Sequence, residues 1–521
     1  MFGLLLTVAL GASVLAGEAL ARRLRVAAPI LLLIIGGLLG LVPGLTAVEM
    51  PSEVVLLLFL PALLYSEAIL TSLRELRRYL RGILLQATLL VALTAGAVAV
   101  VGHLFGLPWA PAWVLGAALA PTDATAVSAF AKALPRQQIT ILRAESLLND
   151  GMALTIYALA TAVVVQQSTV TVLDISWRVL LAYGGGAAAG LLVAWVGIQT
   201  RKRLTDQLLL NLLALLTPFV AYLLAEAVEA SGVLATVIAG LLIGRSNPRV
   251  ARASTRLQGL AFWNLAAFVL NGALFVLVGL ELHTAVARLS AHELLLGLGA
   301  VLVVSLVLVA VRIGFLFASA YFIRALDRSE RQLARRLPNS SRVVRGFAGF
   351  RGAVSLAAAL GVPVTVASGA AFPGRDLIVF VTAGVIVVTL VGQGLLLPVL
   401  VRRVQLPNEP DPAPARRSAA LKATEQALTY LDQEAATLGA SGPATAIVRE
   451  RYQQTSDRLR RGLGDDTAEE ERQTRQLLLA LLDRKRSAIL SLRDIREIDD
   501  QDLHDLQRHL DIEELRLTDP S

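Results

Sequence analysis

The chain is built from long runs of apolar residues, and these runs restrict its possible folds more than any other feature. Residues 91–101, 300–311 and 377–397 are almost entirely apolar, and 55% of all 521 residues are hydrophobic. A soluble protein of this length needs far more polar surface to cover its core. Runs of this length and composition are typical of membrane-spanning helices. The sequence therefore predicts an all-α polytopic membrane protein.

Basic residues orient the predicted membrane-spanning segments. We place thirteen segments at about 3–21, 29–47, 52–71, 83–105, 112–131, 139–165, 177–200, 208–228, 232–244, 259–281, 292–322, 346–366 and 377–400. With the amino terminus outside, the inner loops hold 25 Lys and Arg residues, Arg342 and Arg345 among them. The outer loops hold Arg288 and Arg375, with Arg178 at the edge of a segment. Since positively charged loops stay inside, we expect an external amino terminus and a cytoplasmic carboxyl terminus.

The order of the segments predicts an inverted repeat. If the seventh segment is a linker, segments 1–6 and 8–13 form two six-helix halves of opposite topology, as in many secondary transporters. Segments 5 and 12 take equivalent places in these halves. Pro121 lies in the centre of the fifth, and Gly352, Gly361 and Pro363 interrupt the twelfth. We therefore expect two discontinuous crossing helices whose unwound backbone can coordinate ions.

Charge and composition exclude several other classes of protein. The net charge is +8, but the first 410 residues carry 31 Lys and Arg against 18 Asp and Glu, while residues 411–521 carry 17 against 22. The basic residues lie in short loops, so they are topology signals and no nucleic-acid interface is expected. The absence of cysteine excludes disulfides and thiolate sites. Without an HExxH motif or a Ser–His pair at matching depth, we expect no enzymatic activity and no cofactor besides the transported ions.

The carboxyl-terminal part of the sequence differs from the rest. Residues 404–414 are rich in proline and predict a stiff linker. Residues 415–521 are charged and have helical periodicity, which predicts a cytoplasmic domain of three or four helices. No Gly-rich dinucleotide-binding motif follows a strand there. Regulation or dimer contact is one interpretation of this domain, and a solvated helical tail is the other.

Two acidic motifs lie inside consecutive apolar segments. At about 1.5 Å per residue, Thr122 and Asp123 lie at the centre of the fifth segment and Asp150 about 3 Å from the centre of the sixth. Ser146 shares the face of Asp150 one turn earlier. Carboxylate, hydroxyl and carbonyl oxygens are ligands for hard cations such as Na⁺ or Li⁺. Because burial favours its protonated form, Asp150 can exchange a proton for a cation, which is the minimal arrangement for antiport.

Two further acids need separate interpretations. Glu145 lies about 7 Å closer to the cytoplasm than Asp150, at the depth of Arg312 in the eleventh segment. A charge in lipid requires a partner, so we expect a buried structural ion pair between Glu145 and Arg312. Glu67 lies at the inner end of the third segment, where ion contact and simple interfacial exposure are both open. Polar residues that only join helices are the alternative for the whole cluster.

Several sequence motifs resemble those of the cation:proton antiporters of the sodium/proton exchanger type. They follow in the family's order over residues 1–403: LPALLY at 60–65, APTDATAV at 120–127, ESLLNDGMAL at 145–154, FVLVGL at 275–280, Arg312, and GFRGA at 349–353. The resembled branch comprises bacterial Na⁺/H⁺ antiporters with an Asn-Asp pair, here Asn149 and Asp150. The spacing around Ser66 differs from the commoner pattern of the family.

The resemblance implies roles for individual residues. Asp150 corresponds to the carboxylate that exchanges cation and proton, Ser146 to a co-ligand, and Thr122 to an oxygen donor, so that Na⁺ is expected at these three. Asp123 corresponds to an acid that hydrogen-bonds the amide of Asn149. The other implied roles are a stabilising ion pair for Glu145 and Arg312, an ion contact for Glu67, and a gating or structural role for Arg351.

The same resemblance implies how the protein works. It predicts alternating-access exchange of Na⁺ or Li⁺ for H⁺, electroneutral and one for one, in the plasma membrane of a prokaryote. It further implies a homodimer in which core helices at about 83–165 and 292–400 move against the remaining scaffold helices. K⁺/H⁺ exchange by the same fold is the alternative, because the sequence does not set the radius of the ion. A cation channel is the rival from another class, and the proline-broken helices argue against it.

Overall fold

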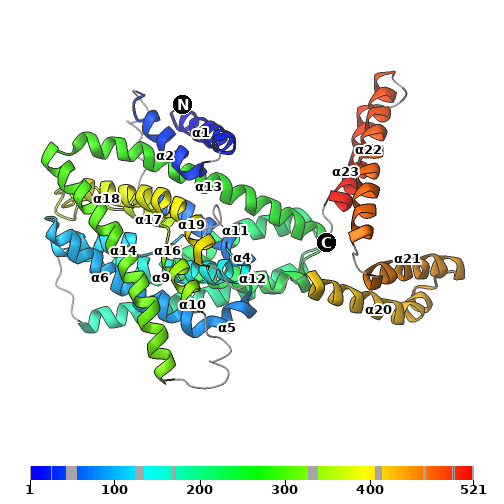
Figure 1. Ribbon diagram of the computed structural model, residues 1–521, viewed down its shortest axis with the longest axis horizontal. Helices are drawn as coiled ribbons and strands as arrows, with labels where there is room; N and C mark the ends of the chain where they lie inside the picture. The colour runs from blue at the N-terminus through cyan, green and yellow to red at the C-terminus, as the bar shows by residue number, and fades with distance from the viewer. Residues whose placement is uncertain are drawn as a thin grey trace. The chain divides into compact units, whose positions relative to one another are not determined.

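The computed structural model describes residues 2–518 except 25, 43–54, 124–133, 167–171, 327–337, 405–412, 462–464, 496 and 498. Those residues form helices joined by short connections, with one isolated β-bridge between Thr365 and Ala371 (Figure 1). They divide into two compact units, Met1–Glu409 and Pro410–Ser521. The fold class expected from the sequence is thus observed over the described part of the chain.

The helices of the first unit follow the predicted segments in order. Up to the first broken segment they are α1 (Phe2–Leu24), α2 (Ala28–Leu39), the π-helical η1 (Val55–Phe59) continued by α4 (Leu60–Leu70), α5 (Leu73–Leu85), the π-helical η2 (Gln86–Leu90) continued by α6 (Val91–Leu104), and α7 (Trp109–Leu119). Next come α9 (Arg136–Gln166), α10 (Val172–Arg203), α11 (Gln207–Glu226), α12 (Gly232–Val250), α13 (Ala253–Arg288) and α14 (Ala291–Leu326). The last are α16 (Asn339–Phe347), α17 (Ala353–Leu360), and α18 (Arg375–Val388) continued by η4 (Thr389–Gln393) and α19 (Gly394–Val404).

Each of the thirteen predicted segments contains a helix, but their lengths differ. Among the described residues, seven helices are long and apolar enough to cross a membrane. α7 has 11 residues and α17 has 8. A helix rises about 1.5 Å per residue, so neither spans a hydrocarbon core of about 30 Å. The fifth and twelfth segments are therefore discontinuous, while the number of crossings and the inverted repeat stay predictions.

Apolar side chains cover the outside of the long helices. On α11 and α14, for example, Leu208 is 78% exposed and Leu306 is 71% exposed. Soluble monomers rarely present continuous apolar surfaces of this kind. A hydrocarbon solvent accepts such side chains, which agrees with a protein that crosses the membrane several times.

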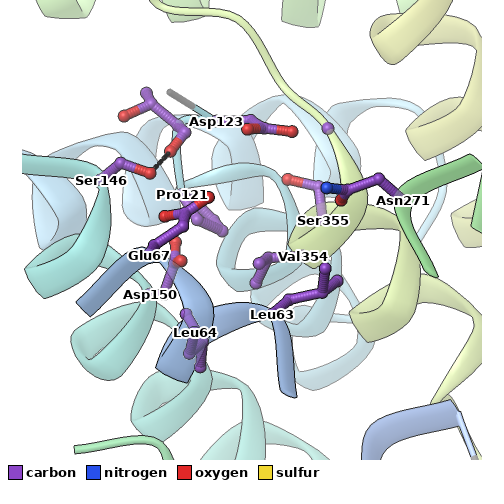
Figure 2. Close-up of a pocket in the computed structure, with 12 residues that line it drawn as sticks. Leu63, Leu64, Glu67, Pro121, Asp123, Ser146, Asp150, Asn271, Val354 and Ser355 are labelled. Atoms are coloured by element: carbon purple, nitrogen blue, oxygen red, sulfur yellow. Dashed lines mark hydrogen bonds between the residues drawn. The ribbon is translucent and has the colours of Figure 1, made fainter. Parts of the chain in front are cut away.

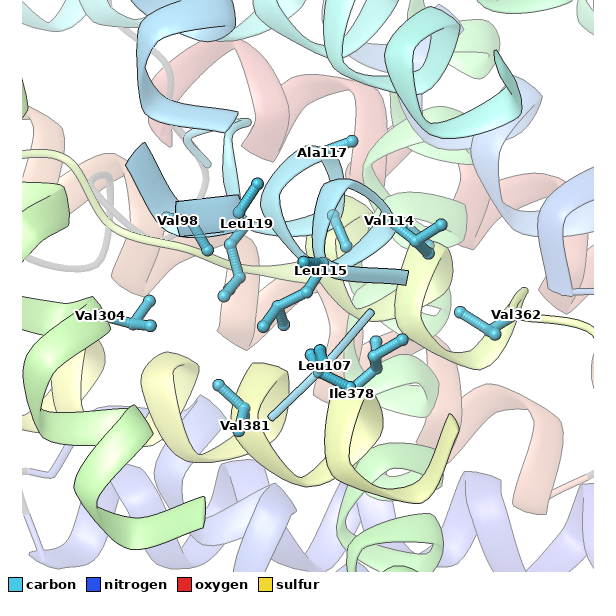
Figure 3. Packing of buried hydrophobic residues seen from close by; sticks show 14 of the residues in the cluster. Val98, Leu107, Val114, Leu115, Ala117, Leu119, Val304, Val362, Ile378 and Val381 are labelled. Carbon is cyan, nitrogen blue, oxygen red and sulfur yellow. The ribbon is translucent and has the colours of Figure 1, made fainter. Parts of the chain in front are cut away.

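Several clusters of buried side chains organise the first unit. The largest cluster unites α6, α7, α14, α17 and α18 through residues such as Leu115, Val304 and Ile378 (Figure 3). α7 approaches α6 closely, because a Cβ on Gly116 would overlap the carbonyl of Ala95. Another cluster joins α10, α11 and α12. α12 in turn packs against α4, the short helix that carries Glu67.

The described residues of the second unit form four helices: α20 (Ala413–Leu438), α21 (Gly442–Arg461), α22 (Asp465–Asp494) and α23 (Asp500–Thr518). α20 packs against α21, and α22 packs against α23. Exposed ion pairs such as Arg460–Glu425, at 2.6 Å, join the first two. Most of the predicted linker lies outside the described residues, but Ala413 and Pro414 already belong to α20.

Candidate functional site

The two discontinuous segments cross at their breaks. α7 ends at Leu119 and residues 121–123 have no regular secondary structure, while α16 ends at Phe347 and α17 begins at Ala353. Pro121 has no backbone N–H, so the helix cannot continue through it without losing a hydrogen bond. At the crossing, the backbone N–H of Asp123 donates to the carbonyl of Phe350 at 2.8 Å. This bond joins two segments more than 200 residues apart in the sequence.

Each broken helix end lies against a charge from the other segment. The last carbonyls of a helix lack partners and carry partial negative charge, and its first N–H groups carry partial positive charge. Arg351 Nε donates to the carbonyl of Leu119, at the end of α7, at 2.9 Å, and its Nη1 donates to the carbonyl of Gly349. Asp123 lies against Gly352, the residue that precedes α17, so closely that a Cβ on this glycine would overlap Asp123 Oδ2. Asp123 and Arg351 thus compensate the two helix ends.

Gly352→Ala is expected to slow the ion exchange that the sequence motifs imply by about fivefold or more, if the cost of about 1–3 kcal/mol for inserting a methyl group into a filled site falls on the transport step. The added Cβ would push the Asp123 carboxylate away from the start of α17. The measurement is the initial rate of cation-driven proton movement in proteoliposomes at equal protein content. Gly314→Ala is the matched control, because a Cβ there meets nothing within 4 Å. Equal rates for the two variants would show that this contact is dispensable.

Helix α9 places its polar face against the break in the fifth segment. Ser146 Oγ donates to the carbonyl of Thr122 at 2.6 Å, and Asn149 Nδ2 donates to Thr122 Oγ1 at 3.0 Å. Asp150 follows one turn after Ser146 and is 2% exposed. Its Oδ1 has no hydrogen-bond partner within the described part of the chain. A hydroxyl, a backbone carbonyl and a buried carboxylate therefore meet in one place.

These groups line a pocket between α4, α9, α13, α17 and the unwound fifth segment (Figure 2). Its lining residues are Leu63, Leu64, Glu67, Pro121, Thr122, Asp123, Ser146, Asp150, Asn271, Gly352, Val354 and Ser355. Glu67 and Asp123 are close enough to Asp150 to repel its negative charge. Within the described ranges, no three His, Cys, Asp or Glu side chains are grouped closely enough to hold a metal ion. The lining also offers the hydroxyl-bearing residues Thr122, Ser146 and Ser355.

The pocket gathers only some of the residues that the sequence singled out. Glu67, Thr122, Asp123, Ser146 and Asp150 line it. Asn149 is not a lining residue but bonds to Thr122, while the expected bond from Asn149 to Asp123 stays a prediction. Three further residues, Glu145, Arg312 and Arg351, are buried outside the lining.

A buried network of charges lies one turn from the pocket. Arg312 Nη2 is 2.7 Å from Glu145 Oε1, and Arg345 Nη2 is 3.2 Å from Glu145 Oε2. Arg345 Nη2 also donates to Gln86 Oε1 at 2.9 Å, and Arg312 Nε donates to the carbonyl of Arg345. Glu145 is 0% exposed. The carboxylate thus faces two guanidinium groups, and only one of them was expected.

Sequence reasoning misplaced Arg345 and its neighbour Arg342. Both were counted as basic residues of an inner loop, but both are 6% exposed and belong to α16. Charged residues that follow a long polar connection look like topology signals, which explains the error. A usable signal was present, because Ser341 and Arg345 fall on one helical face four residues apart. Gln86, Asn271 and Ser355 were missed as well, since single polar residues in apolar helices are common.

The chain is similar to known proteins over most of its length. Residues 8–403 match the family described as "Sodium/hydrogen exchanger, transmembrane". An uncharacterized Na⁺/H⁺ exchanger of Mycobacterium tuberculosis is 40% identical over 527 residues, covering 100% of this chain and 97% of the relative. A sodium, potassium, lithium and rubidium/H⁺ antiporter of Bacillus pumilus is 31% identical over 389 residues, 71% of this chain and 57% of the relative.

The fold has a counterpart among solved structures. The sodium proton antiporter MjNhaP1 from Methanocaldococcus jannaschii at pH 8 superposes with a TM-score of 0.58. The match covers 78% of this chain and 99% of that protein at 17% sequence identity, so it shows a shared fold. The family is one of antiporters that exchange monovalent cations for protons, and its members are transporters, not enzymes. By sequence and by fold, this chain is a multi-pass membrane protein that belongs to the sodium/hydrogen exchanger family.

Proposed function

We propose that this protein exchanges Na⁺ or Li⁺ for H⁺ by alternating access, with the cation and the proton competing for Asp150. One observation carries the proposal: a carboxylate that is 2% exposed lines the pocket and has an oxygen without a hydrogen-bond partner in the described structure. An intramembrane carboxylate of this kind is costly unless it binds a proton or a cation. The carbonyl of Thr122 and the hydroxyl of Ser146 are the neutral ligands of the same site.

The surrounding charges favour Asp150 over its neighbours as the exchanging group. Asp123 lies at the start of α17, whose partial positive charge compensates it. The guanidinium of Arg143 is near enough to Glu67 to attract it. The described electrostatic neighbours of Asp150 are the acids Glu67 and Asp123. A single uncompensated carboxylate, with Asn149 in place of a second acid, supports electroneutral one-for-one exchange.

The proposal includes a division of labour among the helices. We assign helices at about 83–165 and 292–400 to a moving core and the others to a scaffold that forms a homodimer. The buried members of the cluster in Figure 3 all belong to the proposed core, whereas α10–α12 pack together in their own cluster. A third cluster joins α4, α12 and α13 to α9 and α17, and it would form the contact between core and scaffold. Residues 415–521 are proposed as a cytoplasmic domain, with the amino terminus outside. The expected cellular location is the plasma membrane of a prokaryote.

The decisive experiment measures ΔpH in proteoliposomes after Na⁺, Li⁺ or K⁺ is added, with the membrane potential clamped and unclamped. Proton movement driven by Na⁺ and Li⁺, and unaffected by potential, is the expected result. A response to K⁺ alone would replace the proposal by K⁺/H⁺ exchange. The Bacillus pumilus relative is named as an antiporter of sodium, potassium, lithium and rubidium, so it does not separate the two. Flux that follows the potential without proton coupling would indicate a channel. If no cation elicits a response, deleting the residues after Arg403 separates an inhibitory tail from a wrong assignment.

A further inference from the structure

The pocket has a second polar wall, which the proposed mechanism does not use. Asn271 lies in the middle of α13, and Ser355 lies in the first turn of α17. Both line the pocket, and Figure 2 shows them on the opposite side of it from Ser146, Glu67 and Asp150. Their side chains carry oxygen atoms but no charge. A cation held by Asp150 would therefore meet neutral oxygen donors across the pocket.

Ser355, Thr161 and Thr382 are the serine and threonine residues whose buried hydroxyls have no hydrogen-bond partner within the described part of the chain, and of these three Ser355 lines the pocket. The hydroxyls of Ser13, Thr155 and Ser305 each donate to the carbonyl four residues earlier, at 2.6, 2.7 and 2.7 Å. Ser355 is 1% exposed, yet its Oγ has no hydrogen-bond partner within the described residues. Four residues before it the chain is at Arg351, outside the helix, so the usual acceptor is displaced. A buried hydroxyl without a partner is unfavourable, and a ligand in the pocket would remove that penalty.

A small cation also needs more ligands than Asp150, Thr122 and Ser146 supply. Hard cations bind several oxygens, and the number and placement of those oxygens decide which ion fits. When the ion enters the pocket it loses part of its hydration shell, and protein oxygens must replace those water molecules. The second wall of the described pocket, with Asn271 and Ser355, can supply further oxygen ligands without adding charge.

Building on the proposed exchange at Asp150, we propose that Ser355 Oγ and the side-chain oxygen of Asn271 form a neutral subsite for the transported monovalent cation. The subsite binds the ion directly or through a water molecule, on the side away from Asp150. It completes the coordination that Asp150, Thr122 and Ser146 begin. It thereby sets the relative affinity for Na⁺, Li⁺ and K⁺ without changing the number of protons exchanged.

The test compares Ser355→Ala with Ser305→Ala, which removes a buried hydroxyl of α14 that does not line the pocket. Apparent KM values for Na⁺, Li⁺ and K⁺ are measured in proteoliposomes. Ser355→Ala is expected to raise the KM for Na⁺ about fivefold, the effect of losing one neutral oxygen contact, and to shift the Na⁺/K⁺ preference. Maximal rates should stay within about twofold, and Ser355→Thr, which keeps the hydroxyl, should restore the preference. Ser305→Ala should leave all three KM values unchanged.

Asn271→Ala provides a second variant in case Ser355→Ala does not fold. Its control is Asn211→Ala, because the Asn211 amide bonds to Gln258 at an exposed position outside the pocket lining. If both pocket variants keep all three KM values within about twofold of the wild type, the subsite is refuted. A rate that falls equally for all ions at unchanged KM points to a structural role and also refutes it.

A binding measurement keeps this inference separate from the proposed exchange. Na⁺ is added to the purified full-length protein, and the rise in unfolding temperature is recorded for the wild type and Ser355→Ala. A rise in the wild type that is smaller in Ser355→Ala supports the subsite even if no exchange is found. If Na⁺ does not stabilise the wild type, or stabilises both proteins equally, the subsite is wrong.

Discussion

Asp150→Asn is expected to reduce cation/proton exchange to the level of empty vesicles while the protein stays folded. Asparagine has almost the shape of aspartate, but its amide neither takes up a proton near neutral pH nor supplies a negative charge to a cation. Because Asp150 Oδ1 has no hydrogen-bond partner in the described structure, little packing or bonding is lost. The variant should also lose any Na⁺-dependent rise in unfolding temperature, since the charge that attracts the ion is gone.

The measurement combines ΔpH in proteoliposomes with the unfolding temperature and elution profile of the purified protein. Asp206→Asn is the matched control, because Asp206 caps α11 at an exposed position and asparagine caps a helix equally well. Normal exchange is expected from that control. Full exchange by Asp150→Asn would falsify the assignment of Asp150 and move the search to Glu67 and Asp123, the other acids of the pocket.

The sequence predicted those features of the fold that depend on one segment at a time. Apolar runs give the helices, and Pro121 marks the break after α7. Helical rise alone put Glu145 and Arg312 at one depth, and the structure places their charged atoms 2.7 Å apart. Periodicity and depth are local quantities, so one sequence is enough to obtain them.

Features that depend on the meeting of distant segments were not predictable in this way. The contact of Asp123 with Gly352 exists only because two breaks cross, and nothing near either residue signals it. Ser355 lies in an alanine-rich helix, where a serine is ordinary, and its importance comes from the pocket it faces. The burial of Arg345 depends on Gln86, 259 residues earlier, whose side chain lies at the start of a π-helical stretch. Such stretches often occur at functional positions.

The second large effect is expected from the charge network around Glu145, where the losses should appear in stability. Glu145→Gln removes the one carboxylate that faces both Arg312 and Arg345, so two guanidinium groups stay buried with one negative charge missing. Breaking a buried ion pair by removing one partner costs roughly 3–5 kcal/mol. Arg312→Ala should cost less than Glu145→Gln, because Arg345 still neutralises the carboxylate. Arg345→Ala should cost least, since the 2.7 Å pair remains.

The order of these three effects separates a structural network from a transport role. Unfolding temperature and membrane yield are measured for each single variant, with Glu425→Gln in the exposed pair with Arg460 as the control that should change neither. The double variant Glu145→Gln with Arg345→Gln should recover part of the stability lost in Glu145→Gln, because one unpaired guanidinium is removed together with its partner. Whatever folded protein remains should keep the cation KM of the wild type, since the network lies outside the pocket lining. If Glu145→Gln unfolds at the wild-type temperature but no longer exchanges ions, Glu145 takes part in transport, and the pocket at Asp150 is only one part of the ion's path.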